Sequence, residues 1–191
     1  HNPWRFEPFF RCKKQKKMKL ALAKPYKGQN LKGWLMSEKL DGWRAVWDGR
    51  TFRSRSGIDL GSFRAIDMPS MRIDGELFLA RGKYQGLSSR LKRGDLEGAV
   101  TFRAFDLPDA KGTLTTRLRK LRGVVSRVCR GRGSSCKVRL VPHKRVRSTE
   151  HARREFERIV RAGGEGLMVK KDVAYVPGRT DSWLKLKEES D

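Results

Sequence analysis

Short stretches of apolar and polar residues, separated by glycine-containing turns, fill the chain from about residue 31 to residue 102. Runs of this kind are typical of β-strands bounded by turns. Asp48-Gly49, between two of the runs, predicts a tight hairpin turn. The strands expected in this half are Gly42–Trp47, Thr51–Ser54, Arg72–Leu79 and Ala99–Phe105.

Two helices are predicted in the second half of the chain. Apolar residues at Leu114, Leu118, Leu121, Val125 and Val128 recur at helical spacing opposite an arginine-rich face. A further helix is expected to begin at Ser148 or Thr149, to bury Phe156, Ile159 and Val160, and to end at Gly163-Gly164. Strands at Gly166–Lys170 and Trp183–Lys187 follow. The order of elements predicts a mixed α+β domain with mostly antiparallel strands.

The chain is of ordinary length and strongly basic. Its 191 residues suit one domain of ordinary size. Lysine and arginine outnumber the acids by 45 to 21, which gives a net charge of +24 spread along the whole chain. This excess predicts a polyanionic partner, and nucleic acid is the first candidate. A membrane surface is the rival, but no long basic amphipathic helix and no membrane-spanning run supports it.

The cysteines do not suggest a metal site. Cys12, Cys129 and Cys136 form no C-x-x-C pair and have no histidine at a zinc-like spacing. Cys129 and Cys136 are close enough in sequence to pair around a Gly-rich loop, but we expect two free thiols. A reducing compartment follows, so we expect a cytoplasmic protein, or a phage protein acting in the host cytoplasm, with export left open.

Residues 1–17 differ from the rest of the chain. They hold a short basic run at residues 12–17, and Met18 would make a natural start. We interpret 1–17 as a basic N-terminal flank outside the fold and 18–191 as the folded domain.

The chemistry centres on Ser37-Glu38-Lys39-Leu40-Asp41-Gly42-Trp43-Arg44. A lysine acts as a nucleophile only when its amine is neutral, and neighbouring cations or burial lower the pKa of a lysine. Asp41 offers an oxygen ligand and Arg44 a rigid polar fork. By itself this stretch is more often a solvated strand-to-turn segment with scattered charges.

Several smaller clusters follow in order, and each has an ordinary explanation alone. Phe105 and Met168 suit a core, and Lys185 and Lys187 alternate on one exposed strand face. The clusters are Ser54-Arg55-Ser56-Gly57, Asp74-Gly75-Glu76, Phe105-Asp106, Glu165–Lys170 and Lys185-Leu186-Lys187.

Taken in order, these clusters and Lys39–Arg44 resemble the nucleotidyltransferase motifs of ATP-dependent DNA ligases, most closely the small bacterial and phage-type enzymes. The resemblance covers about residues 20 to 187. It implies an ATP-grasp-like adenylation domain of mainly antiparallel sheets with flanking helices, and a nucleotide bound between the sheets.

The resemblance also implies roles for individual residues. Lys39 would attack the α-phosphate of ATP and carry AMP as a covalent lysyl–AMP. Arg44 and Glu76 would hold the ribose, while Phe105 and Met168 would enclose the adenine.

The remaining implied roles concern the base edge, the phosphates and the metal. Glu38 would lie at the base edge, Arg55 would contact phosphate, and Lys185 and Lys187 would steady the α-phosphate as part of the catalytic set. Glu165, with Glu76 or with the catalytic Asp41, would organise Mg²⁺ or Mn²⁺. The implied partner is nicked double-stranded DNA, and a monomer is expected.

One departure from the family pattern concerns the end of the chain. Family members carry a C-terminal OB-fold with a sixth, basic motif, whereas this chain ends at Asp191. We therefore expect the OB-fold to be absent or supplied elsewhere, and self-adenylylation to be impaired. Alternatives to a DNA ligase are an RNA ligase, a capping-type nucleotidyltransferase, or a non-catalytic, basic nucleic-acid-binding relic of a ligase.

Overall fold

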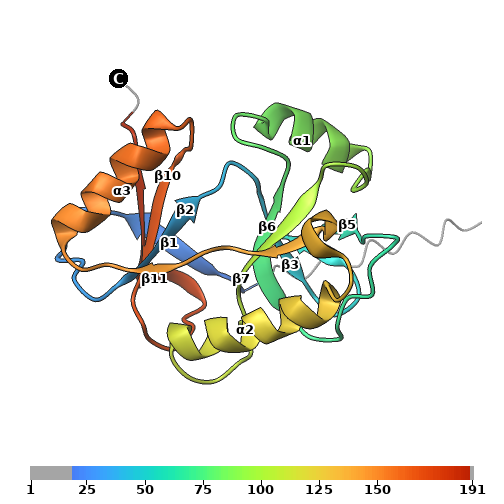
Figure 1. Ribbon diagram of the computed structural model, residues 1–191, viewed down its shortest axis with the longest axis horizontal. Coiled ribbons are helices and arrows are strands. Elements are labelled where there is room, and N and C mark those ends of the chain that lie inside the picture. The colour runs from blue at the N-terminus through green and yellow to red at the C-terminus, as the bar shows by residue number, and fades with distance from the viewer. Residues whose placement is uncertain (1–18, 190–191) are drawn as a thin grey trace, which may run out of the picture.

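The computed structural model describes residues 19–189, which form two β-sheets lying side by side with helices around them (Figure 1). One sheet has five strands, in the order β1 (Ala21–Pro25), β11 (Gly178–Lys187), β10 (Gly166–Lys170), β2 (Leu35–Lys39) and β9 (Lys144–Arg145). The other has six, in the order β5 (Asp59–Gly61), β4 (Phe52–Ser54), β3 (Trp43–Trp47), β6 (Ile73–Phe78), β7 (Thr101–Asp106) and β8 (Val138–Leu140).

Antiparallel pairing dominates both sheets. Among the strand pairs of residues 19–189, only β1 with β11 and β7 with β8 run parallel. The predicted hairpin joins β3 to β4, where the Asp48 backbone N–H donates to the Thr51 carbonyl at 3.0 Å. The predicted mixed α+β architecture is confirmed.

Both helices predicted from the sequence are present. Helix α2 (Leu114–Val128) runs below the two sheets in Figure 1, and α3 (Thr149–Arg161) lies on the outer side of the five-stranded sheet. Ser148 caps α3 by accepting a hydrogen bond from the His151 N–H at 3.0 Å, which stabilises the first turn. A short 3₁₀ turn, η1 (Gly133–Ser135), follows α2.

A third helix, α1 (Tyr84–Lys92), was not predicted, because residues 31–102 were interpreted as strands. Its sequence contains Gly86 and two serines, which are poor helix formers. The available sequence signal was the spacing of Leu87 and Leu91, which are four residues apart and both buried.

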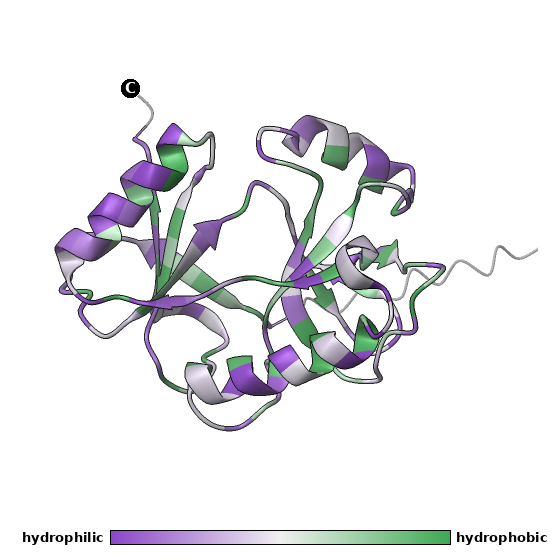
Figure 2. Ribbon diagram, viewed as in Figure 1, coloured by the Kyte–Doolittle hydropathy of each residue, from purple (hydrophilic) through white to green (hydrophobic). Residues whose placement is uncertain are grey.

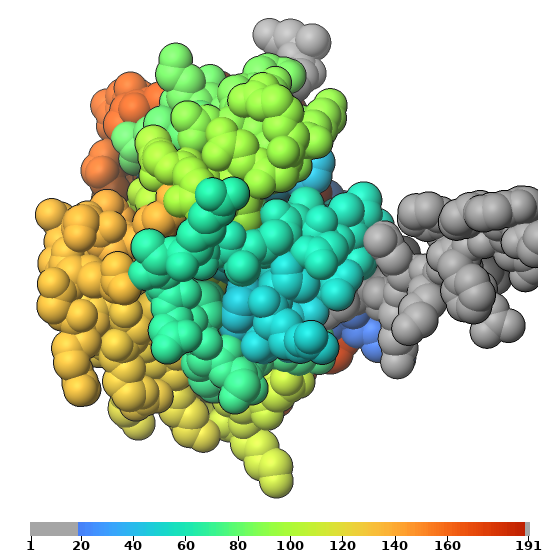
Figure 3. Space-filling view, turned by 90° about the vertical axis from the view of Figure 1, so that its right-hand side faces the viewer, coloured from blue at the N-terminus to red at the C-terminus, as the bar shows by residue number. Residues whose placement is uncertain are grey.

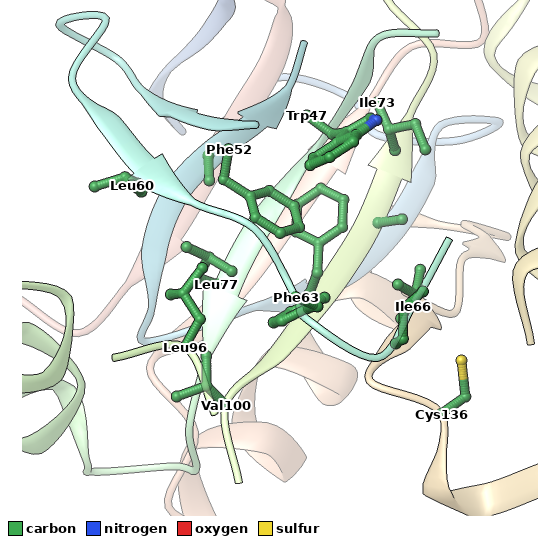
Figure 4. Packing of buried hydrophobic residues seen from close by; sticks show 14 of the residues in the cluster. Trp47, Phe52, Leu60, Phe63, Ile66, Ile73, Leu77, Leu96, Val100 and Cys136 are labelled. Carbon is green, nitrogen blue, oxygen red and sulfur yellow. The ribbon is translucent and has the colours of Figure 1, made fainter. Parts of the chain in front are cut away.

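The six-stranded sheet buries the larger core on its outer face. Alternate residues of its strands point to that face, and they pack with residues from α1, α2 and the loop after β5. Figure 4 shows Phe52 at the centre of this cluster, close to Trp47 and Phe63. The cluster includes Ala45, Ile73, Leu77, Leu91, Phe102, Ala104, Leu121 and Val124.

The five-stranded sheet follows the same rule. Leu167, Val169 and Leu184 point outward under Ala152 and Ile159 of α3, and the green bands on these elements in Figure 2 follow this contact. A third, smaller cluster of Ala21, Phe105, Val141 and Trp183 contains residues from both sheets. Each sheet therefore has one face under helices and one face toward the other sheet.

The expectation of two free thiols is wrong for Cys129 and Cys136. They form a disulfide with a Cα–Cα distance of 5.5 Å. Cys129 caps the end of α2 and Cys136 follows η1 just before β8, so the chain returns on itself between two packed elements. The sequence spacing allowed this pairing but did not distinguish a disulfide from two free thiols. The argument for a reducing compartment loses its support, because disulfides persist mainly in oxidising surroundings.

The predicted flank at 1–17 and Cys12 lie outside the described residues, and the boundary at residue 18 stays a prediction. Within residues 19–189, no helix combines the length and the apolar character needed to cross a bilayer.

Candidate active site

A pocket of about 210 Å³ lies between the inner faces of the two sheets. Strand alternation explains its lining, since the residues beside the outward core positions point inward. The five-stranded sheet contributes Ser37, Lys39, Met168, Lys170, Trp183 and Lys185, and the six-stranded sheet contributes Arg44, Glu76 and Phe105.

Lys39 ends strand β2 and is held by an acid. Its Nζ lies 2.5 Å from Oε1 of Glu165, and both side chains are partly exposed. Register explains this contact, because Lys39 pairs with Gly166, the residue after Glu165. The nearest charged partner of the predicted nucleophile is thus a carboxylate, while cations line the pocket around it.

Glycines in the motifs allow backbone segments to approach closely at this site. A Cβ on Gly42 would lie 2.4 Å from the Leu77 carbonyl oxygen and 2.9 Å from Glu76 Oε2. A Cβ on Gly166 would lie 2.1 Å from the Leu186 carbonyl oxygen. Both distances are too short for any other residue type without rearrangement.

Arg44 is anchored by Asp74. Its Nε and Nη2 donate to the two carboxylate oxygens at 2.7 and 2.8 Å, and Nη2 also donates to the Ala21 carbonyl at 2.9 Å. Burial alone would lower the pKa of Arg44, but Asp74 outweighs it and the net effect raises the pKa. Among the described residues, Nη1 has no hydrogen-bond partner and remains free for a ligand such as a ribose.

Glu76 is a buried acid with an unused oxygen. Its Oε2 is buried and has no hydrogen-bond partner among residues 19–189. Burial raises the pKa of Glu76 to about 7, and Arg44 and Lys39 only partly oppose this shift. An orphaned acceptor inside a pocket is costly unless a ligand donates to it, and a ribose hydroxyl is such a donor.

Phe105 and Met168 come from opposite sheets and both line the pocket, as an adenine enclosure requires. Trp183 packs edge-on against Phe105 with ring centroids 5.8 Å apart. The Nζ of Lys170 lies 4.1 Å from each ring centroid. Burial lowers the pKa of Lys170 to about 8, and Asp106 and Asp74 oppose this shift.

Of the three residues predicted to contact phosphate, two line the pocket and one does not. Arg55 and Lys185 line the pocket, whereas Lys187, two residues further along β11, lines a separate hollow beside α3. Burial lowers the pKa of Lys185, and nearby Lys187 and Lys39 add to the effect.

Glu38 lines the pocket but is already paired. Arg81, which follows β6, donates to both of its carboxylate oxygens at 2.8 and 2.9 Å. Arg81 also donates to the Ala162 carbonyl at the end of α3, so it ties the two halves of the molecule together. The predicted contact of Glu38 with the base edge would compete with this ion pair and stays a prediction.

The predicted metal ligands do not form a ready-made site. Among residues 19–189, no group of three or more His, Cys, Asp or Glu side chains is arranged to hold a metal ion. Burial raises the pKa of Asp41, and repulsion by Glu165 adds to this effect while Lys39 opposes it. Oxygen donors next to Lys39 fit Mg²⁺ or Mn²⁺ only if substrate phosphates complete the coordination, as is usual for Mg²⁺.

Comparison with known proteins identifies the family. The family model described as ATP dependent DNA ligase domain matches residues 16–187. The chain belongs to this family.

Two relatives support the assignment, and one more distant structure shares the fold. A DNA ligase of Haemophilus influenzae is 32% identical over 173 residues, which cover 88% of this chain and 63% of that protein. A solved structure from work on Lig E DNA ligases is 31% identical, with a TM-score of 0.76, over 88% of this chain and 68% of that one. The Chlorella virus DNA ligase-adenylate, 17% identical over 90% and 69% of the two chains, shares the fold with a TM-score of 0.69. The ligase domain thus spans less than two thirds of the Haemophilus relative.

Sequence reasoning gave no role to several residues that line the site. Lys170 and Trp183 were part of recognised clusters, and alternation along β10 and β11 places both on the same face as Met168 and Lys185. Arg179 and Val141 also line the pocket. Gly178-Arg179 was part of the pattern that favoured a DNA ligase but was given no role in the site, and Val141 belongs to no recognised motif.

Proposed function

We propose that this chain is the catalytic domain of an ATP-dependent DNA ligase that seals nicks in double-stranded DNA through a lysyl–AMP on Lys39. The observation that carries the proposal is the position of the Lys39 amine. It lies at a pocket whose other walls hold an aromatic ring, Phe105, and the buried acid Glu76, whose Oε2 has no hydrogen-bond partner among residues 19–189. This set matches the three parts of a nucleoside monophosphate: phosphate, ribose and base.

In the first step the neutral amine of Lys39 attacks the α-phosphorus of ATP. A P–N bond forms, and the bond from that phosphorus to the pyrophosphate oxygen breaks. Glu165, 2.5 Å from the amine, is placed to take the proton that Lys39 must lose. Lys185 and Arg55 supply positive charge where the phosphate oxygens would lie.

A divalent metal would neutralise phosphate charge and polarise the α-phosphorus during this transfer. Glu165, with Asp41 or Glu76, would hold it together with phosphate oxygens. Burial raises the pKa of Asp41 and repulsion by Glu165 adds to the effect, and a cation close to both groups would remove that repulsion.

The later steps move the AMP to DNA. The 5′-phosphate at a nick displaces Lys39 from the AMP phosphorus, and the 3′-hydroxyl then attacks the 5′-phosphate and releases AMP. The net charge of +24 and the DNA ligase named among the relatives support DNA as the substrate.

The test is label transfer from α-labelled ATP with Mg²⁺ or Mn²⁺, comparing wild type with Lys39→Ala. We expect covalent label on the wild type and none on the variant. Lys92→Ala, which removes an exposed lysine at the end of α1, serves as the control and should label normally.

Because the chain spans only 63% of its Haemophilus relative, pre-adenylylated nicked DNA belongs in the same experiment. Sealing of that substrate without labelling by ATP would locate the defect in the first step, as expected if self-adenylylation is impaired. Label on Lys39→Ala, or neither labelling nor sealing by wild type, would contradict the proposal. Labelling by GTP in place of ATP would favour a capping-type enzyme.

A further inference from the structure

Cations occur along the whole chain, but one stretch has no acids to offset them. Residues 110–149 contain thirteen lysines and arginines and no aspartate or glutamate. This stretch includes α2, the loop closed by the Cys129–Cys136 disulfide, and strands β8 and β9.

Helix α2 divides its cations between two environments. Arg117 is buried and paired with Asp106, with Nε 2.7 Å from Oδ1. Four others are exposed, and among residues 19–189 none of them has an acidic partner within ion-pair distance: Arg119, Lys120, Arg122 and Arg127.

Helix α3 shows that the same chain can neutralise an arginine-rich helix. Arg153 pairs with Glu150 at 2.6 Å and Arg158 pairs with Glu155 at 2.5 Å, each three residues apart. On α2 the pair at this spacing is Arg119 and Arg122, and like charges there destabilise a helix. A polyanion bound to α2 would remove this repulsion.

The surroundings of α2 extend the basic surface. The disulfide-closed loop at its end carries Arg130 and Arg132, both exposed, and the segment coloured yellow to orange in Figure 3 forms a continuous part of the surface there. Along the helix runs a groove of about 540 Å³, lined in part by Arg119, Arg122 and Arg145.

This surface lies on the opposite side of the six-stranded sheet from the nucleotide pocket. Leu121 and Val124 of α2 pack on the outer face with Phe102 and Ala104, whereas Glu76 and Phe105 face the pocket. A ligand on α2 would therefore be separated from Lys39 by the sheet.

We propose that the exposed face of α2 and the loop closed by Cys129–Cys136 form a second surface, which binds the phosphate backbone of duplex DNA whether or not a nick is present. This binding does not depend on nucleotide transfer at Lys39. No large apolar side chain of α2 is exposed among the described residues, so the surface lacks the insertion that a membrane interface uses. One arginine guanidinium can donate two parallel hydrogen bonds to two oxygens of a phosphate.

The test is the affinity for an unnicked duplex, measured by fluorescence anisotropy over a range of salt concentrations. Arg119→Gln combined with Arg122→Gln is compared with Arg153→Gln combined with Arg158→Gln on α3. Both double variants remove two exposed arginines and change the net charge equally. We expect the α2 variant to bind at least about tenfold more weakly near 0.1 M salt and to lower the salt slope by about two, since each phosphate contact contributes about 0.9.

Folding is monitored separately by thermal unfolding. The α2 variant should be as stable as wild type or more stable, because it removes a like-charge pair, so weaker binding cannot be ascribed to unfolding. Equal losses of affinity in the two variants, or no loss in the α2 variant, would overturn the proposal. Label transfer to Lys39 should be unchanged in the α2 variant, and Lys39→Ala should bind the unnicked duplex like wild type, which keeps this test apart from that of the ligase reaction.

Discussion

The two faces of strand β6 have opposite chemistry although they share one backbone. Ile73 and Leu77 point outward and are fully buried in the core beneath α1 and α2. Asp74 and Glu76 point inward, where Asp74 holds Arg44 and Glu76 keeps an unpartnered oxygen. Burial of an apolar side chain on the outer face stabilises the folded state. Burial of an acid on the inner face stabilises it only when the acid has a partner.

The five-stranded sheet repeats the contrast. Leu167 and Val169 of β10 lie under α3, while Met168 and Lys170 between them line the pocket. The difference teaches that stability and ligand binding are assigned to alternate residues of the same strands. Substitutions on the two faces should therefore separate the two properties.

The largest effect is expected on the outer face at Phe52. Its ring lies within 5.1 Å of the ring centroids of Trp47, Phe63 and Phe102, and it is fully buried. Phe52→Ala should lower the free energy of unfolding by about 3–5 kcal/mol, because it leaves a cavity. Urea unfolding measures this change, and the milder Phe52→Leu serves if the alanine variant does not fold. Nucleotide affinity per folded molecule should remain unchanged in Phe52→Leu, and a loss there would break the separation of the two faces.

A smaller effect is expected from the disulfide that links α2 to the start of β8. The two cysteines are seven positions apart, and closing so short a loop stabilises by about 2 kcal/mol in the chain-entropy model. Replacing both by alanine, Cys129→Ala with Cys136→Ala, should lower the unfolding free energy by this amount. Wild type with reductant should match the variant. An unchanged stability in both would show that the loop is held without the bond.

The sequence predicts these faces to different extents. Alternation of Lys185 and Lys187 in β11 was visible in the sequence. The resemblance implied one nucleotide site for Lys39, Glu76 and Lys185, and these three residues line the same pocket. Contacts between distant segments were not visible, because no local pattern encodes them. The pairing of Glu38 with Arg81, 43 residues away, is of this kind. The two cysteines are only seven positions apart, and their spacing left both a disulfide and two free thiols open.

Local propensity also gave one wrong prediction. Helix α1 was not predicted, because Gly86 and the serines are poor helix formers and only two leucines mark its buried side. Tertiary packing of those leucines stabilises the helix. The resemblance assigned Lys187 to the α-phosphate together with Lys185. Lys185 lines the pocket and Lys187 lines the hollow beside α3, so the role of Lys187 stays a prediction. The roles of individual residues stay predictions until a ligand is bound.

The smallest change in folding free energy is expected on the inner face, at Glu76. Burial raises the pKa of Glu76 from 4.5 to about 7, so the folded protein prefers the protonated acid. The wild type therefore loses stability from this group as pH rises from about 4.5 to about 7, and the loss then stays constant. Glu76→Gln removes this dependence. The whole shift corresponds to at most about 3 kcal/mol, at about 1.4 kcal/mol per pKa unit, and relaxation of the charged site reduces this cost, so the variant should be about 1 kcal/mol more stable than wild type at pH 8 but not at pH 4. The same variant should bind ATP about tenfold more weakly, because a charged acceptor for the ribose is lost. Thermal unfolding against pH and ATP titration measure the two effects. A variant that lost both stability and affinity at pH 8 would place Glu76 in the structural framework and not in the site.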